Sequence, residues 1–555
     1  MKRFDGAKTA LILFGAINLL DAISAFGGHA VDLPPWKFWL YSCWVLIRNT
    51  VGYTMLMTAP VYFMGGMSRF LLIPLFGFAL LTECATSYAA NVFHADLSDA
   101  WIQLIENTSL AEIAGFLKMS ATLPAVAGVC AFMLVLGGGS MLLWRARYPQ
   151  ASMRSTAKGI AFSAPFLLAN CLLIELQCGN WRFGVNQMKY TEFVYKSIKS
   201  IADMRGIRLA CNQPALPEKL DVEAAAEDMP DGVFVIGESS TRNNWHLYGY
   251  QRQTTPRMDA LYSAGELVRF DDVAGTQPAT AEALSLLLTD VSFDNNRDGN
   301  WTLAEAYRRA GYRCILISNQ YTWGDTTSTL YALFNGCEKR TSPQIEFGKS
   351  GYDEKLVEIL ENELGKGDAR PTIAFVHLSG IHYPVTPERI HPPEDAYFTD
   401  KESEEYMRRF APKTRDRLNR YDDGILYEDK VLDKIVNVLR KRKRPAFMFF
   451  VSDHGESPRA ETWRSYTDCD VYEVPAVLWM SAKYRSKFCH IAERFGAAAA
   501  KRMQQDEMTH GLLELGLIRG VPEKTGKSFL KDDFKGRFPR YINKGKMCYP
   551  RDGRR

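Results

Sequence analysis

The segment GVFVIGES, residues 232–239, has the composition of a strand buried on both faces, and it ends in a glutamate and a serine. Runs of this kind, separated by helical patterns, are typical of a mostly parallel sheet that helices cover on both faces. The chain after residue 228 is therefore expected to form one α/β domain, residues 229–555. Four further strands are predicted: RCILISNQ (313–320), TIAFVHLSG (372–380), AFMFFVSDHG (446–455) and VPAVLWMS (474–481).

Four of these five strands end in residues that can bind a cation or a substrate. Because the carboxyl ends of parallel strands meet at one edge of a sheet, we expect these side chains to lie close together. Each motif alone is compatible with a turn, a helix cap or a surface histidine. Together they indicate a metal site, since carboxylate and imidazole groups bind Zn²⁺. The polar endings are Glu238, Asn319 with Gln320, His377 with nearby His382, and Asp453 with His454.

The segment GTQPATAEAL, residues 275–284, leads into a predicted helix that begins at Thr280. The amides at a helix N-terminus attract an anionic phosphoryl group. A hydroxyl beside a bound cation also loses its proton more easily. Thr280 is therefore placed to complete the metal site, whereas Thr276 lies four residues earlier in the loop and is expected to have a structural role.

The first 180 residues are dominated by long apolar segments. Each is long enough to cross a hydrocarbon core of about 30 Å, so a five-helix transmembrane domain over residues 1–180 is predicted. A polar, amphipathic segment near 94–120 is expected on the membrane surface, and residues 181–228 read as a bridging helix and a linker. The five predicted spans lie near 9–28, 38–60, 68–91, 122–144 and 159–178.

Basic residues concentrate at one set of span ends, whereas the opposite loops hold few, Lys37 and Lys118, which places the N-terminus inside and the α/β domain outside. The chain carries 67 Lys and Arg against 63 Asp and Glu, a balance that excludes a dedicated nucleic-acid binder. Asp21, Arg48 and Glu83 fall within spans, where they form an ion-pair network or face a lipid headgroup. The flanking basic residues are Lys2, Arg3, Lys8, Arg69, Arg145, Arg147, Arg154 and Lys158.

Seven of the eleven cysteines follow the last predicted span and face a compartment in which disulfides persist. Their pairing cannot be derived from one sequence. The basic run RKRKR, residues 440–444, reads either as a solvated helix end or as a contact with an anionic glycolipid or membrane surface. These seven cysteines are Cys178, Cys211, Cys314, Cys337, Cys469, Cys489 and Cys548.

Several strings of residues resemble those of the membrane-bound phosphoethanolamine transferases of Gram-negative envelopes, whose catalytic domain belongs to the alkaline phosphatase/sulfatase superfamily. The resemblance covers most of the chain, including the five spans and the helix start at Thr280. It implies an inner-membrane, multi-pass protein with a sulfatase-like domain in the periplasm. The strings are GESSTRNNWHLYGYQRQTTPRMD (237–259), HLSGIHYP (377–384), YDDGILYEDKVL (421–432) and SDHGES (452–457).

The resemblance also implies roles for individual residues. Glu238, Asp453 and His454 become zinc ligands, and Thr280 becomes both a ligand and the nucleophile. His382 lies near the transferred phosphate or a second metal, and His377 binds substrate or is structural. Thr108 and Glu112 match positions near the donor lipid.

The implied reaction is zinc-dependent transfer of phosphoethanolamine from phosphatidylethanolamine, through a covalent threonine intermediate, to an envelope glycoconjugate. The expected enzyme is a monomer that contacts membrane lipid and no nucleic acid. Cysteines do not flank Thr280, and no histidine follows SDHGES closely, so a full ligand set is expected for one zinc and not for a second. Leu104 also stands where the family often has asparagine. These departures favour a lipopolysaccharide core sugar or a periplasmic glucan over lipid A as the acceptor.

Three other functions are compatible with parts of the pattern. A glycerol-phosphate transferase would share the topology and the nucleophile but use phosphatidylglycerol. A sulfatase needs a modifiable Cys or Ser, which the segment TAEAL does not contain. A membrane scaffold or sensor would have a degenerate site, which the presence of all four inner residues argues against.

Overall fold

The computed structural model of the chain divides into two compact units, residues 1–99 with 118–199 and residues 100–117 with 200–555. The boundaries predicted at residues 180 and 228 stay predictions. The structure describes residues 5–26, 54, 58–92, 123–150, 152, 156–157, 160, 216–224, 227–291, 301–320, 332–341, 351–366, 370–382, 390–398, 405–459, 469–521, 528–536, 541–542 and 546–547.

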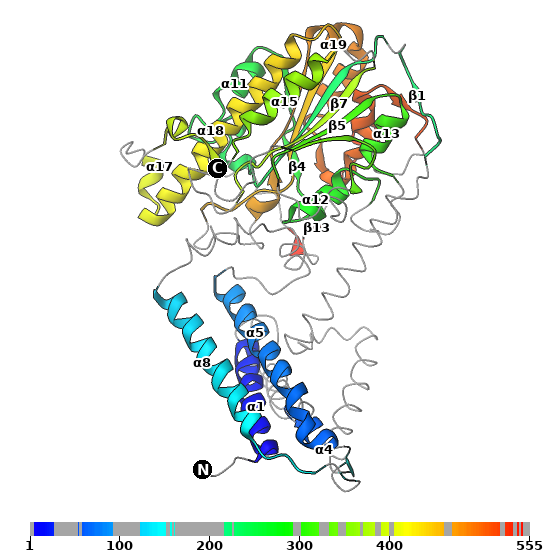
Figure 1. Ribbon diagram of the computed structural model, residues 1–555. Helices are drawn as coiled ribbons and strands as arrows, with labels where there is room; N and C mark the ends of the chain where they lie inside the picture. Colours follow the sequence, from blue (N-terminus) through cyan, green and yellow to red (C-terminus); the bar gives the residue numbers. More distant parts are fainter. Residues whose placement is uncertain are drawn as a thin grey trace. The chain divides into compact units, whose positions relative to one another are not determined.

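The first unit contains long apolar helices at three of the predicted spans (Figure 1). Helix α1 (Gly6–Phe26), α5 (Arg69–Val92) and α8 (Leu123–Arg145) match the first, third and fourth. Among the described residues, two helical stretches are long and apolar enough to cross a membrane, Pro60–Cys84 and Gly128–Arg145. The prediction of five spans is therefore supported for two of them.

Most of the remaining membrane predictions lie outside the described residues. The second and fifth spans, 38–60 and 159–178, are described at only a few positions, which include α4 (Pro60–Met64). The amphipathic segment 94–120, with Thr108 and Glu112, is also outside the described part of the chain.

Helices α1, α5 and α8 contact one another through large apolar side chains. The rings of Phe14 and Phe76 meet edge to face at 6.0 Å between centroids. A Cβ atom on Gly139 would lie 2.4 Å from the Phe76 ring, so the glycine lets α8 approach α5. Leu134 on α8 is 76% exposed, as expected for a side chain that faces lipid.

Basic residues gather at one end of this unit. The Gly6 amide donates a hydrogen bond to the Arg147 carbonyl at 2.7 Å, which joins the start of α1 to the segment after α8. The Arg69 guanidinium, at the start of α5, lies over the rings of Trp144 and Tyr148. These contacts bring the start of α1, the start of α5 and the segment after α8 together.

The second unit is built around a seven-stranded sheet in the order β3-β10-β8-β2-β7-β5-β6. Strand β2 runs parallel to both of its neighbours, β8 and β7. All five predicted strands are confirmed. The strands are β2 (Asp231–Gly237), β3 (Leu267–Arg269), β5 (Arg313–Ser318), β6 (Glu338–Thr341), β7 (Thr372–His377), β8 (Ala446–Ser452) and β10 (Ala476–Met480).

The sheet is mixed, because β10 runs antiparallel to β8 and to β3. Its carboxyl end therefore points to the edge opposite the ends of β2 and β8. This direction agrees with the sequence, in which VPAVLWMS was the one predicted strand without polar ligand residues at its end.

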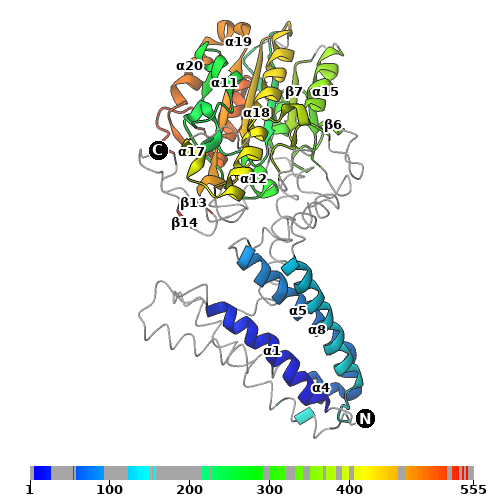
Figure 2. The ribbon, with the colours of Figure 1, turned by 90° about the vertical axis from the view of Figure 1, so that its left-hand side faces the viewer.

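Helices cover both faces of the sheet (Figures 1 and 2). Side chains of β2 alternate between two apolar cores, with Val233 and Val235 in one and Phe234 and Ile236 in the other. The first core is closed by α11 (Pro256–Ser263), α15 (Glu354–Gly365) and α18 (Pro412–Arg440). The second is closed by α12 (Thr280–Leu287), α13 (Leu303–Arg309), α19 (Ala482–Lys487), α20 (Cys489–Ala498) and α21 (Thr509–Leu515).

Small sheets and a disulfide complete the unit. Cys314 on β5 is bonded to Cys337, a pairing the sequence left open and one that fits an oxidising compartment. The small sheet β11-β4-β9 lies just before the loop that leads to α12. The remaining short elements are β1 (Asp221–Val222), β4 (Asp272–Ala274), β9 (Glu473–Val474), β11 (Arg502–Gln504), β12 (Ile518–Arg519), β13 (Tyr541–Ile542), β14 (Lys546–Met547) and α17 (Glu405–Arg408).

Candidate metal centre

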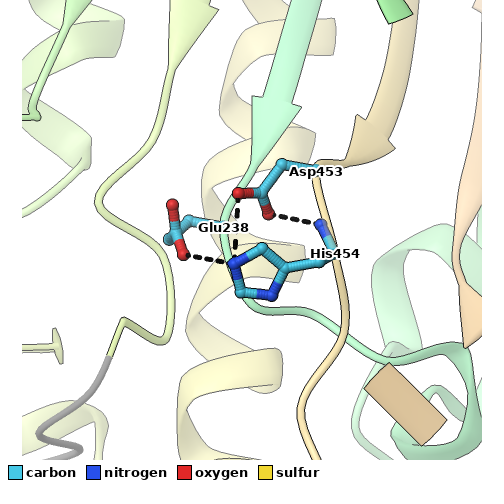
Figure 3. Close-up of side chains that lie close together, drawn as sticks. All are labelled: Glu238, Asp453 and His454. Carbon is cyan, nitrogen blue, oxygen red and sulfur yellow. Dashed lines mark hydrogen bonds and ion pairs between the residues drawn. The ribbon is translucent and has the colours of Figure 1, made fainter. Parts of the chain in front are cut away.

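Three predicted ligands meet at the ends of two neighbouring strands (Figure 3). Gly237 on β2 pairs with Ser452 on β8, so the next residues, Glu238 and Asp453, leave the sheet side by side. The Asp453 amide donates to the Gly237 carbonyl at 3.0 Å, which holds the two strand ends together. Ligand atoms of Glu238, Asp453 and His454 all lie within 4.8 Å of one another, and all three residues are buried.

The imidazole of His454 has the orientation of a metal ligand. Its Nδ1 lies 2.8 Å from the Gly455 carbonyl, which can only accept a hydrogen bond, so Nδ1 carries the proton. Its Nε2 then points at the carboxylates, 3.5 Å from Glu238 Oε1 and 3.4 Å from Asp453 Oδ2. A backbone partner of this kind is what fixes the tautomer of histidines that bind metals.

The Asp453 carboxylate is incompletely satisfied by the protein. Its Oδ1 accepts the amides of Ser239 at 3.1 Å and His454 at 2.6 Å, whereas buried Oδ2 accepts no hydrogen bond. Burial raises the pKa of Asp453 to about 6. Two buried carboxylates and an imidazole, with one carboxylate oxygen unsatisfied, fit a divalent cation, and the donor set is one that Zn²⁺ accepts.

Thr280 lies where the sequence predicted, at the first residue of α12. Its hydroxyl donates a hydrogen bond to Glu238 Oε2 at 3.0 Å and is partly exposed. The hydroxyl therefore lies at a helix N-terminus and beside the proposed ligands at once. Thr276, predicted to be structural, is fully buried, and its amide donates to Gln505 Oε1 at 3.1 Å.

Backbone geometry around Glu238 is unusual. Ser239 has φ +59°, a conformation that costs free energy for a residue with a side chain and that clusters at functional sites. Gly380 has φ +51°, and a Cβ atom there would lie 2.7 Å from the Glu238 carbonyl oxygen. The loop after β7 thus packs directly on the backbone of Glu238.

Gln320 is a contact of the site that the sequence reasoning did not assign. Its side-chain amide donates to Glu238 Oε2 at 3.2 Å and to the Leu378 carbonyl at 2.9 Å. The signal was present, since Gln320 belongs to the polar ending of the second predicted strand, RCILISNQ (313–320). Its contact with Glu238 depends on β7 lying between β5 and β2, an order that one sequence does not supply.

The two predicted substrate-binding histidines lie in different environments. His377 ends β7 and is buried, and burial lowers its pKa to about 4, so it is neutral. His382 is half-buried in the loop that follows Gly380. Neither belongs to the cluster of close ligand atoms formed by Glu238, Asp453 and His454 among the described residues.

The long string at 237–259 is joined to α18 by buried hydrogen bonds. Asp422 on α18 accepts hydrogen bonds from Asn244 at 2.6 Å, Tyr250 at 2.8 Å and Arg252 at 2.9 Å. Asp429 lies about two helical turns further along α18 and accepts the Met258 amide at 2.9 Å. These hydrogen bonds hold the segment after Glu238 against α18.

A second part of the same network lies nearer the site. The Tyr421 hydroxyl donates to the Ser239 carbonyl at 2.6 Å and accepts the Thr241 amide at 2.9 Å. The Ser240 hydroxyl donates to Glu428 at 2.7 Å. Burial raises the pKa of Glu428 to about 8, so this carboxyl is largely protonated at neutral pH and needs no cation.

Comparisons with known proteins agree with this geometry. The sulfatase family profile matches residues 230–517. A phosphoethanolamine transferase EptA of Helicobacter pylori is 30% identical over 261 residues, 46% of this chain and 48% of the relative. A phosphoethanolamine transferase EptC of Escherichia coli K12 is 28% identical over 269 residues, 46% of this chain and 45% of the relative. The chain thus spans about half the length of the curated relatives it matches.

Solved structures show the same fold. The C-terminal periplasmic domain of EcEptC from Escherichia coli, in complex with Zn, matches with a TM-score of 0.53 and 25% identity. That match covers 61% of this chain and 95% of the solved chain. The integral membrane protein EptA from Neisseria meningitidis matches with a TM-score of 0.68 over 96% of this chain and 98% of its own. At 18% identity this second likeness concerns the fold alone.

Proposed function

The chain belongs to the sulfatase family and is related to the phosphoethanolamine transferases, and from this premise we propose that it transfers phosphoethanolamine from phosphatidylethanolamine to an envelope glycoconjugate. One observation carries the proposal. The Thr280 hydroxyl lies at the N-terminus of α12 and bonds to Glu238, within a buried cluster of three metal-ligand residues. An activated hydroxyl next to an anion site is what a covalent phosphotransferase requires.

The reaction has two displacements. Thr280 Oγ1 attacks the phosphorus of the donor, a new O–P bond forms, and the bond to diacylglycerol breaks. Diacylglycerol leaves with a proton, and phosphoethanolamine stays on the threonine. An acceptor hydroxyl or phosphate oxygen then attacks the same phosphorus, and Thr280 recovers its proton.

Residues of the chain prepare each displacement. Glu238 Oε2 accepts the hydrogen bond of the Thr280 hydroxyl, which aims the oxygen lone pairs away from Glu238. Amides at the start of α12 stabilise the negative charge on the phosphoryl oxygens. Zinc held by Glu238, Asp453 and His454, with Thr280 as a further ligand, would lower the pKa of the hydroxyl and neutralise phosphoryl charge.

The three buried ligand residues support the proposal of one zinc at this position. Asp453 Oδ2, which has no hydrogen-bond partner, lies 3.4 Å from His454 Nε2, so both atoms are available to one cation. We assign His382 and His377 to substrate binding near this centre, and Thr108 and Glu112 to the donor lipid. For a second zinc the sequence offers no full ligand set.

The cellular setting follows from the same reading. We propose a monomer in the inner membrane with residues 229–555 in the periplasm, where the disulfide between Cys314 and Cys337 is stable. The acceptor is proposed to be a lipopolysaccharide core sugar or a periplasmic glucan in preference to lipid A. Support for this choice is the absence of cysteines beside Thr280.

The test is to trap the intermediate. The full-length chain in detergent is incubated with phosphatidylethanolamine or phosphatidylglycerol and then weighed intact by mass spectrometry. We expect one phosphoethanolamine group on the wild type, retained in Thr280→Ser and absent in Thr280→Ala. An adduct of glycerol phosphate would identify the alternative donor, and an adduct that persists in Thr280→Ala would overturn the assignment of the nucleophile.

A further inference from the structure

The basic run at residues 440–444 has two halves with different partners. Its first three residues each pair with a carboxylate: Arg440 with Glu266 at 2.7 Å, Lys441 with Glu361 at 2.8 Å, and Arg442 with Asp231 at 2.8 Å. These pairs tie the end of α18 to the rest of the domain. The first half of the run is therefore explained by folding.

The second half of the run, Lys443 and Arg444, takes part in hydrogen bonds that involve backbone carbonyls. Arg444 donates to the carbonyls of Glu227 at 3.1 Å and Met229 at 3.3 Å. The Lys443 carbonyl accepts the Lys483 ammonium from α19 at 2.8 Å. Neither Lys443 nor Lys483 forms an ion pair with a described carboxylate. The Lys483 ammonium is thus held at the backbone of Lys443, and both side chains line the same pocket without an ion pair to a described carboxylate.

These residues line a pocket of about 410 Å³, within the range of small-ligand sites. Lys487 also lines it and pairs with Asp228. Four basic side chains stand there against two acidic ones, and Pro445 is the one apolar residue in the lining. The pocket is therefore suited to a small, polar, negatively charged group and offers no surface for an acyl chain.

The pocket and the metal centre lie at opposite edges of the sheet. Pro445 immediately precedes β8 and Met229 lies just before β2, whereas Asp453 and Glu238 follow the other ends of these strands. At about 3.3 Å per residue, a seven-residue strand separates the two sites by about 20 Å. Helices α19 and α12 mark these two edges in both views (Figures 1 and 2). A ligand in this pocket cannot be the group that reacts at Thr280.

We propose that this pocket binds a phosphate monoester carried on a sugar, as a docking site for a phosphorylated glycan. Ammonium groups form charge-assisted hydrogen bonds with phosphate oxygens. Arg444, braced on two carbonyls, holds the loop that presents Lys443. A sugar phosphate matches the polar lining, and the uncompensated charge of Lys443 and Lys483 selects it over the neutral sugar.

The test measures binding directly, without turnover. The full-length chain in detergent is titrated with glucose 6-phosphate, with glucose as the uncharged probe, by isothermal calorimetry. The double variant Lys443→Gln/Lys483→Gln should bind the sugar phosphate at least about tenfold more weakly, because two charge-assisted hydrogen bonds are lost. Thr280→Ala should bind it as the wild type does, so the result stands apart from the fate of the proposed transfer reaction.

A matched control removes the same number of charges from the same run. Arg440→Gln/Lys441→Gln should leave the affinity within about twofold, because those side chains do not line the pocket and exposed charges act weakly at a distance. Equal losses in the two double variants would overturn the proposal, as would no loss in Lys443→Gln/Lys483→Gln. Loss of binding to phosphatidylglycerol vesicles with unchanged binding of glucose 6-phosphate would overturn it in favour of a membrane contact.

Discussion

Two buried clusters of carboxylates flank the segment that follows β2, and they differ in how their charges are satisfied. On α18, Asp422 accepts three side-chain hydrogen bonds, one of them from the buried guanidinium of Arg252. At the strand ends, Asp453 Oδ2 accepts none and faces His454 Nε2. The Asp422 carboxylate is satisfied by protein donors, whereas the second cluster leaves one ligand oxygen open to a cation. Satisfaction by protein donors is what separates Asp422 from Asp453.

The largest effect is expected at the incomplete cluster. Asp453→Asn should lower zinc affinity by more than about a hundredfold and abolish adduct formation, because it removes a charged ligand. The metal-free variant should be no less stable than the metal-free wild type, since it no longer buries an uncompensated charge. Zinc affinity by competition with a chelator, and thermal unfolding with and without zinc, would measure both. A metal-free variant that is strongly destabilised would make Asp453 a structural residue.

The complete cluster should respond in the opposite way. Asp422→Ala should lower the free energy of unfolding by about 3–5 kcal/mol, because it leaves the Arg252 charge buried without its partner. Thermal and denaturant unfolding of the metal-free chain would show this loss. The paired replacement Arg252→Met/Asp422→Leu should recover part of it, and a single variant as stable as the wild type would remove the distinction between the clusters.

Gln320 tests whether a neighbour can tune the incomplete cluster. Gln320→Ala should weaken zinc binding about 10- to 100-fold, because Glu238 Oε2 loses a donor that orients the carboxylate. Gln253→Ala, a change at an exposed glutamine bonded to His246, is the matched control and should leave zinc affinity unchanged. Identical zinc affinities for Gln320→Ala and the wild type would show that Gln320 does not position Glu238.

The smallest effect is a dependence on pH. Burial raises the pKa of Asp453 to about 6 in the metal-free protein, so a proton competes with the metal below that pH. Zinc affinity should therefore fall by about fivefold between pH 6 and pH 5 through Asp453 alone. The stability of the metal-free protein changes with pH in the opposite direction to zinc affinity. The raised pKa of Asp453 favours the folded state as the pH falls, and this stabilisation disappears as the pH rises through about 6. Asp453→Asn should flatten this dependence.

Much of the fold was predictable because the composition of a short segment is enough to indicate a buried strand or an apolar span. Buried strands are continuous apolar runs, and the five predicted ones were confirmed. The direction of β10 was not predictable, because an antiparallel and a parallel buried strand have the same composition. The division of the β2 side chains between two separate cores likewise depends on the helices that cover each face of the sheet, and the sequence does not place those helices.

The site likewise contains residues that the sequence could name and contacts that only the folded chain makes. Glu238, Asp453, His454 and Thr280 could be named from residue type and from their place after strands or before a helix. Gln320 could not be assigned to Glu238, since their contact follows from the order β2-β7-β5. The basic run 440–444 also looked uniform, and the structure divided it into ion-paired residues and residues that line a pocket.

The sequence by itself determined which groups are available: two carboxylates, an imidazole and a hydroxyl at the ends of predicted elements. The tertiary structure decided which of them are satisfied. A carboxylate with all its oxygens satisfied and one without have the same local sequence signature, because the donors come from distant segments, as Asn244 does for Asp422, 178 residues away. Only folding brings such partners within hydrogen-bond distance, and the free energy of a buried charge depends on whether they arrive.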